Sequence, residues 1–274
     1  ATPRLNLILS DGKIPVATLK VDESAKISFV DVFYTQQGQM DGKKDDTTNT
    51  KNRFWHHASA LKRREEWTAP LPIFSLDKPL WVYANVRYKL NKSFTGAGYY
   101  YGTYTTDSYN LSSVMRVTGS VELKKAGVVA SLQKSRIIEE FKGEWKKEWF
   151  SYKAEKWGIK THKIYDPMWQ ASEGAKLCME VKSEIANKMI IGLDGYAAEV
   201  SLIGKNEWQT IQLSVGEFKD ALNKPLKNWI GLKEIRLDDT DTLRPPRGSS
   251  AKSRKLGDQW EGKVPEFRKL RWES

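Results

Sequence analysis

Short runs of β-branched and aromatic residues, separated by Gly, Pro, Asn and Asp, recur along the first half of the chain. They occupy residues 5–10, 16–21, 26–35, 52–59 and 79–90. Several of these runs alternate apolar with polar positions, which is the period of a strand with one buried face. In residues 26–35 both alternating sets are largely apolar, which indicates a central strand with two covered faces. We therefore predict a β-sandwich in this half.

The segments between these runs carry weaker signals. Residues 38–52 have no apolar period and predict a long exposed loop, and the charged stretch 61–67 fits a helix or a strand equally well. Residues 95–110 mix Gly with five tyrosines and predict an irregular loop that could serve as a lid or an interface. Residues 112–123 predict a last strand, and 124–136 a connector. The first domain is thus expected to end at residue 130.

Beyond that boundary, strand-like runs follow one another at close intervals. They occupy residues 136–141, 175–183, 188–195, 197–204, 207–215 and 232–239. Regular short strands with turn residues between them indicate a second sandwich. Residues 216–229 instead place Phe218, Leu222 and Leu226 at helical spacing, which predicts a short helical turn that crosses between the sheets before Pro225 ends it. The predicted fold is all-β, with one sandwich over residues 1–130 and another over 131–274 that ends in a basic C-terminal tail.

Composition supports a folded chain of two domains. Its 274 residues exceed the usual size of one domain, and 39% hydrophobic content with 11 Trp, 11 Tyr and 9 Phe excludes a disordered composition. The sequence has no run of 18 apolar residues, so it predicts no transmembrane helix, and its N-terminus lacks a signal-peptide pattern. The chain opens with Ala1 rather than Met. We interpret it as a processed product or as a piece of a longer polypeptide.

A single cysteine, Cys178, excludes an internal disulfide bond. It alternates with Leu177 and Met179 in residues 175–183, which places it on a strand. We expect a buried, unreactive thiol.

The net charge of +11 and the pI of 9.4 favour an anionic partner, whether nucleic acid, acidic polysaccharide or a membrane surface. The basic residues are spread along the chain and are densest in residues 244–274. No zinc-finger spacing, RNA-binding signature or recognition helix accompanies them, so we do not expect nucleic-acid binding. A solvated cationic face is the alternative explanation.

The second half follows a hydrophobic framework over about 110 residues, from IIEEFKGEWKKEWF through KLCMEVKS to NEWQTIQLSVGEFKDALNKPLKNWIGLKEIRL. Its order is Trp208, an alternating strand, Phe218 with Asp220, Trp229 and a second alternating strand. This order resembles the galactose-binding-like jelly rolls, the fold of many carbohydrate-binding modules. The resemblance implies a jelly-roll β-sandwich. It does not specify a ligand, because many such domains bind no sugar.

The first half is similar to the immunoglobulin-like or fibronectin-like domain that follows bacterial α/β-hydrolases of the dienelactone hydrolase and PhoPQ-activated kind. The matching segments are NRFWHHAS, EEWTAPLPI and PLWVYANVRY, with Trp55, Trp67 and Trp81 as the aromatic positions. This resemblance implies that the chain is the accessory part of a secreted bacterial hydrolase, extracellular or periplasmic, with the catalytic domain outside the chain.

Catalytic patterns are missing from the sequence. No Gly-x-Ser-x-Gly nucleophile elbow occurs, and a catalytic triad would have to use His56, His57 or His162, the only three histidines. Neighbours on a strand point to opposite faces, so at most one of His56 and His57 could serve a given site. We interpret the pair as strand packing plus a surface imidazole. We therefore expect no enzymatic activity from this chain alone.

An acidic turn at residues 237–243 offers oxygen ligands of the kind that Ca²⁺ requires. Its carboxylates are Asp238, Asp239 and Asp241. By resemblance to jelly rolls with a structural calcium, Glu139 or Glu140 would join Asp238 as ligands. The alternative is a solvated turn with side-chain caps.

Residues 141–170 concentrate rings and cations in one stretch, as a glycan-binding surface requires. Flat rings stack on the C–H faces of sugars while polar side chains meet the hydroxyls, and the interspersed lysines would complement an acidic glycan. The predicted ligand-binding residues are Trp145, Trp157, Trp169, Tyr152, Tyr165 and Lys163. Trp149, Trp208 and Trp229 stand beside patterned strands, and we assign them to the core instead. Long Lys stems also cover Trp faces where no ligand is involved.

The sequence therefore predicts a non-catalytic accessory module that binds polysaccharide and concentrates an attached hydrolase on its substrate. The net charge favours an acidic polysaccharide. The alternative is a structural or protein-interaction module. In that case the tyrosine-rich and tryptophan-rich stretches would dock onto a neighbouring domain or subunit. Only a sugar binder should give a saturable change of tryptophan fluorescence.

Overall fold

The computed structural model describes residues 1–38, 53–97, 102–151 and 157–274. Strands dominate these residues, and every strand pairing is antiparallel. Besides short 3-10 turns, the described residues hold one α-helix, α2 (Ser120–Lys125). The prediction of an all-β sandwich fold is confirmed. None of the helices in the described ranges is long and apolar enough to cross a membrane.

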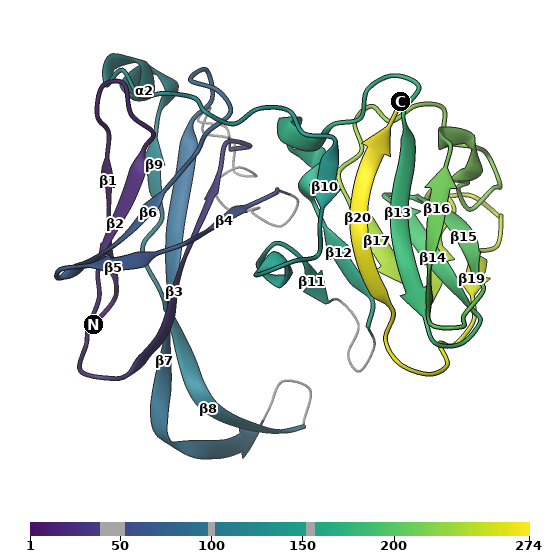
Figure 1. Ribbon diagram of the computed structural model, residues 1–274, viewed down its shortest axis with the longest axis horizontal. Coiled ribbons are helices and arrows are strands. Elements are labelled where there is room, and N and C mark those ends of the chain that lie inside the picture. The colour runs from purple at the N-terminus through teal and green to yellow at the C-terminus, as the bar shows by residue number, and fades with distance from the viewer. Residues whose placement is uncertain (39–52, 98–101, 152–156) are drawn as a thin grey trace. The chain divides into compact units, whose positions relative to one another are not determined.

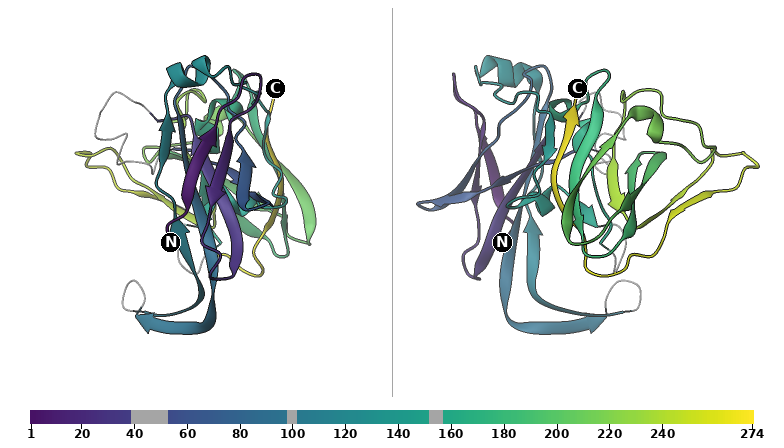
Figure 2. Two further views of the ribbon diagram at one scale, coloured as in Figure 1. Left: turned by 90° about the vertical axis from the view of Figure 1, so that its left-hand side faces the viewer. Right: turned by 45° about the vertical axis from the view of Figure 1, so that its right-hand side comes forward.

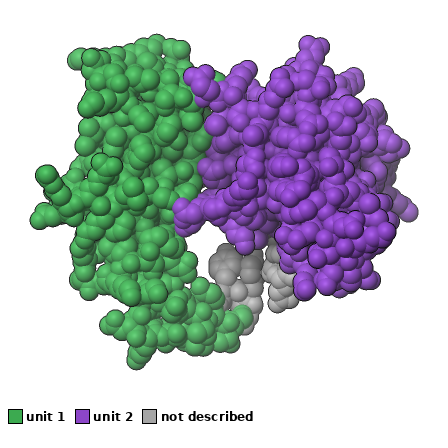
Figure 3. Space-filling view, viewed as in Figure 1, with its two compact units in different colours: residues 1–50, 55–132 green, residues 51–54, 133–274 purple. Residues whose placement is uncertain are grey.

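The chain divides into two compact units, drawn in green and purple in Figure 3. Unit 1 consists of residues 1–50 and 55–132, and unit 2 consists of residues 51–54 and 133–274. The main division thus lies at residues 132 and 133, against the 130 and 131 expected from the sequence. The short segment 51–54, which the sequence places in the first half, belongs to unit 2. The immunoglobulin-like and jelly-roll assignments of the two halves stay predictions.

Unit 1 contains two antiparallel sheets (Figure 1). The first has the strand order β1-β2-β6-β5, and the second has the order β4-β3-β7-β8 with β9 paired to β7. The strands are β1 (Arg4–Ile8), β2 (Val16–Lys20), β3 (Ile27–Thr35), β4 (His56–Ser59), β5 (Leu61–Arg63), β6 (Glu66–Pro70), β7 (Leu80–Ala97), β8 (Thr103–Ser112) and β9 (Arg116–Thr118).

The period of β3 explains why it lies at the centre of its sheet. Val30, Val32 and Tyr34 point into the core of unit 1 and are almost fully buried. The opposite face is covered as well, because the ring of Phe33 stacks on Tyr83 at 5.3 Å between centroids. A strand with two apolar faces is stable only between neighbours, here β4 and β7.

Three expectations for unit 1 are resolved. The charged stretch 61–67 is strand, turn and strand, with Arg64 in the left-handed region (φ 56°) between β5 and β6. The prediction of an irregular loop at residues 95–110 is wrong for the described residues, because these residues extend β7 and β8 into one long hairpin. Tyr99, Tyr100 and Tyr101 lie outside the described residues. The last predicted strand is only β9, because α2 follows at once. Nearly all of the predicted loop 38–52 also lies outside the described residues.

Unit 2 is built on two larger sheets and a short hairpin (Figure 1). The sheets have the orders β10-β20-β13-β16 and β11-β12-β17-β14-β15, and β18 pairs with β19. The strands are β10 (Ile137–Glu139), β11 (Phe150–Ser151), β12 (Ile159–Thr161), β13 (Lys176–Ser183), β14 (Asn187–Leu193), β15 (Tyr196–Leu202), β16 (Glu207–Leu213), β17 (Ile235–Asp238), β18 (Thr240–Leu243), β19 (Arg254–Gly257) and β20 (Glu266–Glu273). The 3-10 turns are η2 (Trp145–Lys147), η3 (Lys163–Tyr165), η4 (Pro167–Trp169) and η5 (Val215–Glu217).

The core of unit 2 lies between these two sheets. Alternate residues of β13, such as Leu177, Met179 and Val181, are buried there together with residues from β14, β16 and β17. Phe54 joins the same core, and its ring meets Trp169 edge-on at 5.1 Å. Burial of a large side chain of this kind stabilises the fold by roughly 1.5–3 kcal/mol.

Residues 216–229 do not form the predicted helical turn. A single 3-10 turn, η5, begins at a Ser214–Glu217 capping box, and the chain then runs irregularly, with Lys219 bridging to Ala197 and to Pro225. Phe218 and Leu226 are buried, whereas Leu222 is exposed. The apolar spacing therefore reflects separate insertions into the core rather than one helical face.

Candidate functional site

A cavity of about 600 Å³ in unit 2 combines more aromatic rings than any other described cavity. We call it the aromatic cavity. It is lined by Phe141, Trp145, Lys146, Trp149, Ser151, Trp157, Ile159, Val264, Pro265, Glu266 and Phe267. A second cavity of about 560 Å³ in the same unit has one aromatic ring in its wall, Trp229.

The rings of the aromatic cavity form a continuous set of contacts. Phe141 lies 5.1 Å from Trp145 and 5.4 Å from Phe267 between ring centroids. Phe267 in turn lies 5.8 Å from Trp157, which meets Trp260 edge-on at 5.0 Å. Trp145 and Trp157 remain partly exposed beside this set, as a stacking surface requires.

A buried ion group holds the wall in place. The Lys163 ammonium lies 2.7 Å from both Glu139 Oε2 and Glu148 Oε2. Glu139 also accepts hydrogen bonds from the Trp149 indole N–H at 3.0 Å and, through its other oxygen, from the Phe141 amide at 3.0 Å. One carboxylate on β10 thus fixes two of the lining aromatic residues.

Polar groups at the cavity are few and lie at its rim. The Lys146 ammonium lies over the Trp145 ring at 5.6 Å, and the Glu266 carboxylate pairs with Lys182 at 2.7 Å. The Trp157 Nε1 is buried and has no hydrogen-bond acceptor among the described protein atoms. A buried N–H without an acceptor costs about 1–3 kcal/mol.

These features suit a ligand with flat C–H faces and hydroxyl groups. Ring faces supply dispersion contacts, while a lone indole donor and rim charges fix orientation.

The predicted ligand-binding residues divide between the cavity and the core. Trp145 and Trp157 line the cavity. Trp169, with 6% of its surface exposed, packs in the core, and Lys163 is as deeply buried beneath the carboxylates described above. We therefore remove Trp169 and Lys163 from the site. Tyr165 is half-buried against Lys233 away from the cavity lining, and Tyr152 lies outside the described residues.

Of the three tryptophans that the sequence assigns to the core, two are buried and one is not. Trp149 and Trp229 are buried, as expected. Trp208 is a correction: it alternates with the buried Ile211 and Leu213 on β16, points away from the core, and lies under the Arg268 guanidinium at 4.0 Å. Lys182 on β13 is paired with Trp208 across the sheet, and its ammonium lies 5.4 Å from the centre of the Trp208 ring as a second cation.

The residues proposed for calcium are placed as follows. Glu139 is engaged by Lys163, and Glu140 pairs with Lys142 at 3.5 Å. Asp238 is buried, and its Oδ1 accepts from the Asp239 amide at 2.8 Å. Over the described ranges, no three His, Cys, Asp or Glu side chains are grouped to hold a metal. Calcium binding stays a prediction without support from this geometry.

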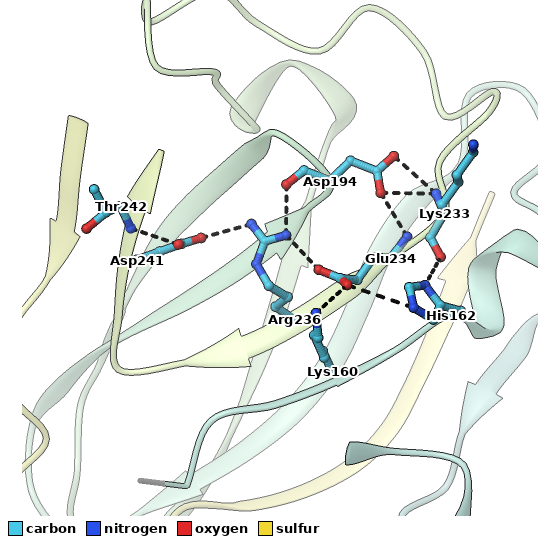
Figure 4. A network of polar contacts seen from close by, with 8 residues as sticks. All are labelled: Lys160, His162, Asp194, Lys233, Glu234, Arg236, Asp241 and Thr242. Carbon is cyan, nitrogen blue, oxygen red and sulfur yellow. Dashed lines mark hydrogen bonds and ion pairs between the residues drawn. The ribbon is translucent and has the colours of Figure 1, made fainter. Parts of the chain in front are cut away.

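The histidines have structural partners. His56 stacks on Tyr34, whereas the His57 Nε2 lies 2.8 Å from Asp31 Oδ1, so the two rings do lie on opposite faces of β4. The prediction that one of the two imidazoles lies at the surface is wrong, because both side chains are nearly buried. His162 belongs to a polar network in which its Nδ1 lies 2.9 Å from the Lys233 carbonyl (Figure 4).

Sequence reasoning missed Phe141, Phe267 and Trp260. Phe267 and Trp260 come from the C-terminal segment, and no local pattern connects that segment with residues 141–157. The pairing of β10 with β20 places Phe267 beside Phe141, and Trp260, which precedes β20, meets Trp157. A strand-pairing prediction for the last strand was the one signal that could have found them.

Comparison with protein-family models, curated proteins and solved structures finds no match to this chain. The resemblances to a hydrolase accessory domain and to a galactose-binding-like jelly roll therefore stay predictions.

Proposed function

We propose that unit 2 is a polysaccharide-binding module and that sugar rings stack on Trp145 and Trp157 in the aromatic cavity. The observation that carries the proposal is the cavity itself, in which four partly exposed rings, those of Phe141, Trp145, Trp157 and Phe267, line the wall together with the buried Trp149. On this proposal the chain contributes binding rather than catalysis, and a hydrolase attached to it would gain local substrate concentration.

The Trp157 indole N–H supports the same proposal. Its nitrogen is buried and has no acceptor among the described protein atoms, so a sugar hydroxyl or ring oxygen would become its acceptor once the Trp157 ring shifts toward the ligand. Stacking together with one directed hydrogen bond is a common basis of weak, selective glycan recognition.

The test is a titration of intrinsic tryptophan fluorescence with neutral and acidic oligosaccharides at about 0.15 M salt, where exposed charges are screened beyond about 8 Å. We expect a saturable change in the wild type. Trp145→Ala and Trp157→Ala should each weaken binding about tenfold or more, which corresponds to 1.4 kcal/mol. Trp157→Phe keeps a ring but removes the donor, so it should show an intermediate loss.

Trp208→Ala is the matched control, because Trp208 is a half-buried indole of the same unit outside the cavity. Equal loss in this control and in the cavity variants would contradict the proposal. Absence of saturable binding to every glycan would favour the alternative, a structural or protein-interaction module.

A further inference from the structure

The hairpin formed by β18, residues 244–253 and β19 concentrates positive charge at an exposed position of unit 2. We call it the basic hairpin. Arg244, Arg247, Lys252, Arg254 and Lys255 lie within it, and no Asp or Glu occurs between Asp241 and Asp258. All but Arg254 are exposed. Figure 2 shows the loop of this hairpin, in yellow-green at the far right of its right-hand view, reaching out from the body of unit 2.

The carboxylates that flank the basic hairpin are already occupied by other cations. Asp241 pairs with Arg236 at 2.9 Å and accepts from the Thr242 amide at 2.7 Å (Figure 4). Asp258 pairs with Lys188 at 3.1 Å. Arg244, Arg247, Lys252 and Lys255 form no ion pair with any described residue. The positive charge of the hairpin is therefore not offset locally.

The basic hairpin is also firmly attached to the sandwich. Leu243 and Leu256 pack on Ile190 and Ala197, on the outer side of the sheet that contains β14 and β15. The Gly257 amide donates to Glu199 at 2.8 Å, and Arg254 donates to the Asp220 carbonyl at 3.3 Å. Cations on an ordered support lose less conformational entropy on binding than cations on a disordered run. This separates the hairpin from an ordinary solvated charge run.

The side chains of the hairpin narrow the kind of partner. The stretch 240–257 contains no aromatic residue, so it offers no platform for stacking nucleic-acid bases. It also exposes no large apolar side chain for insertion into a lipid interface, since Leu243 and Leu256 face the sandwich. Guanidinium groups form paired hydrogen bonds with carboxylate and sulfate groups, and the serines at 249, 250 and 253 add hydroxyl donors.

We propose that the basic hairpin is a second binding surface, separate from the aromatic cavity, for an acidic polysaccharide that carries carboxylate or sulfate groups. This inference rests on the proposed function for its choice of a glycan, and it specifies the substrate as a polyanion. In Figure 1, β19 and β11 lie at opposite sides of unit 2, so a polymer would contact the two surfaces through different residues of its chain.

The test compares two triple variants of the full chain. Arg244→Gln, Arg247→Gln and Lys252→Gln remove three of the five cations of the hairpin, whereas Lys134→Gln, Lys176→Gln and Lys205→Gln remove the same charge from exposed positions of unit 2 elsewhere. The probes are a sulfated polysaccharide, polygalacturonate, a neutral glucan and duplex DNA, each over a series of salt concentrations. Circular dichroism and thermal unfolding check that each variant is folded.

We expect the hairpin variant to bind both acidic polysaccharides about tenfold or more weakly at 0.15 M salt. Each lost cation–anion contact should also reduce the slope of log affinity against log salt by about one, as for phosphate contacts. The control variant should change affinity less than about threefold. Equal losses in the two variants would overturn the proposal, because net charge alone would then explain binding. Duplex DNA bound as tightly as the sulfated polysaccharide, with the same loss, would overturn the choice of partner.

The two proposals fail in different ways. Loss of neutral-glucan binding in Trp145→Ala tests the aromatic cavity and does not involve the hairpin. If the cavity variants bind the neutral glucan and the acidic polymers as the wild type does, while the hairpin variant loses the acidic polymers, the hairpin proposal stands and the proposed function of the cavity fails.

Discussion

The ammonium group of Lys163 lies between Glu139 and Glu148, under the ring of Trp169 at 4.9 Å. In the sequence Lys163 is one of several lysines in an aromatic stretch and has the pattern of a surface cation. The structure buries it instead, because a 3-10 turn directs its side chain inward toward β10. Its charge therefore serves the fold of the cavity wall and is not available to a ligand.

Replacing Lys163 with Met should destabilise unit 2 by about 3–5 kcal/mol, because the buried carboxylate of Glu139 and the partly buried carboxylate of Glu148 would both lose this ion pair. Lys182→Met is the control, since its partner Glu266 is 61% exposed and such pairs contribute at most about 1 kcal/mol. Urea unfolding at pH 7 measures both. Similar losses for the two variants would contradict the role assigned to Lys163.

Cys178 is a buried thiol whose reactivity should be low. Burial, with a further contribution from the Glu273 carboxylate, raises the pKa of the thiol to about 11. At pH 8 the reactive thiolate is therefore scarce in the folded protein. We expect a disulfide reagent to label the chain only after unfolding. Rapid labelling of the native protein at pH 8 would refute this. The strand position was predictable from the alternation with Leu177 and Met179, which face the core, whereas Cys178 is buried on the other face, between its neighbours on β16 and β20.

At the scale of elements, the strands that alternate clearly were predicted and the remaining elements were not. The strands β13 to β17 follow from their apolar period. The β7–β8 hairpin was missed because its outer half has both faces exposed, so no hydrophobic period marks it. The same reasoning applies to the cavity, where Trp145 and Trp157 were found from their local surroundings while Phe267 depended on the pairing of distant strands.

Gly257 fixes the attachment of the basic hairpin. It adopts φ 72°, and a Cβ there would lie 2.0 Å from the Asp239 carbonyl oxygen. Gly257→Ala should therefore displace β19 and cost at least about 1–2 kcal/mol. Hydrogen exchange should accelerate in β18 and β19. Gly216→Ala is the control, because nothing lies within 4 Å of its Cβ position. Unchanged exchange in β19 of the Gly257 variant would show that the hairpin is held by other contacts.

The network of Figure 4 joins β12, β17 and β18 through Glu234, Arg236 and Lys160. Burial opposes ionisation of Glu234, but hydrogen bonds from Lys160 and Arg236 outweigh it and hold the pKa of this carboxyl below its ordinary value of 4.5. A carboxyl with a lowered pKa stabilises the folded state above about pH 4.5 and loses this contribution as pH falls through the folded-state value.

Urea unfolding between pH 7 and pH 3 should therefore show a smaller acid-induced loss of stability in Glu234→Gln than in the wild type. Other carboxyls with lowered pKa values act equally in both proteins, so the difference isolates Glu234. Parallel pH profiles would exclude this linkage.

At the scale of the whole molecule, the all-β class could be predicted from the sequence. The membership of residues 51–54 in unit 2 could not, because a four-residue segment carries no period of its own. Phe54 in the run NRFWHHAS has the same pattern as a residue of the first sandwich. Only its contact with Trp169 assigns it to the second core.

Phe54→Ala should destabilise unit 2 by about 3–5 kcal/mol while leaving unit 1 nearly unchanged. Hydrogen exchange followed separately in β13 and in β3 distinguishes the two units. Phe218→Ala, a buried residue of the same core, is the matched reference. A larger effect in β3 than in β13 would refute the assignment. A fragment of residues 133–274 should likewise be less stable than the same unit in the full chain.

The membership of Phe54 also bears on how the chain is made. A ribosome releases residue 54 well before Trp169 and the strands that surround it, so the second core cannot close on this ring until most of the polypeptide has emerged. During that interval the Phe54 ring has no core to pack into, although the chain of unit 1 is already complete at residue 132. Synthesis that stops early in the second half would leave this ring open to chaperones and proteases. Burial of this one side chain from the N-terminal half therefore depends on completion of the C-terminal half.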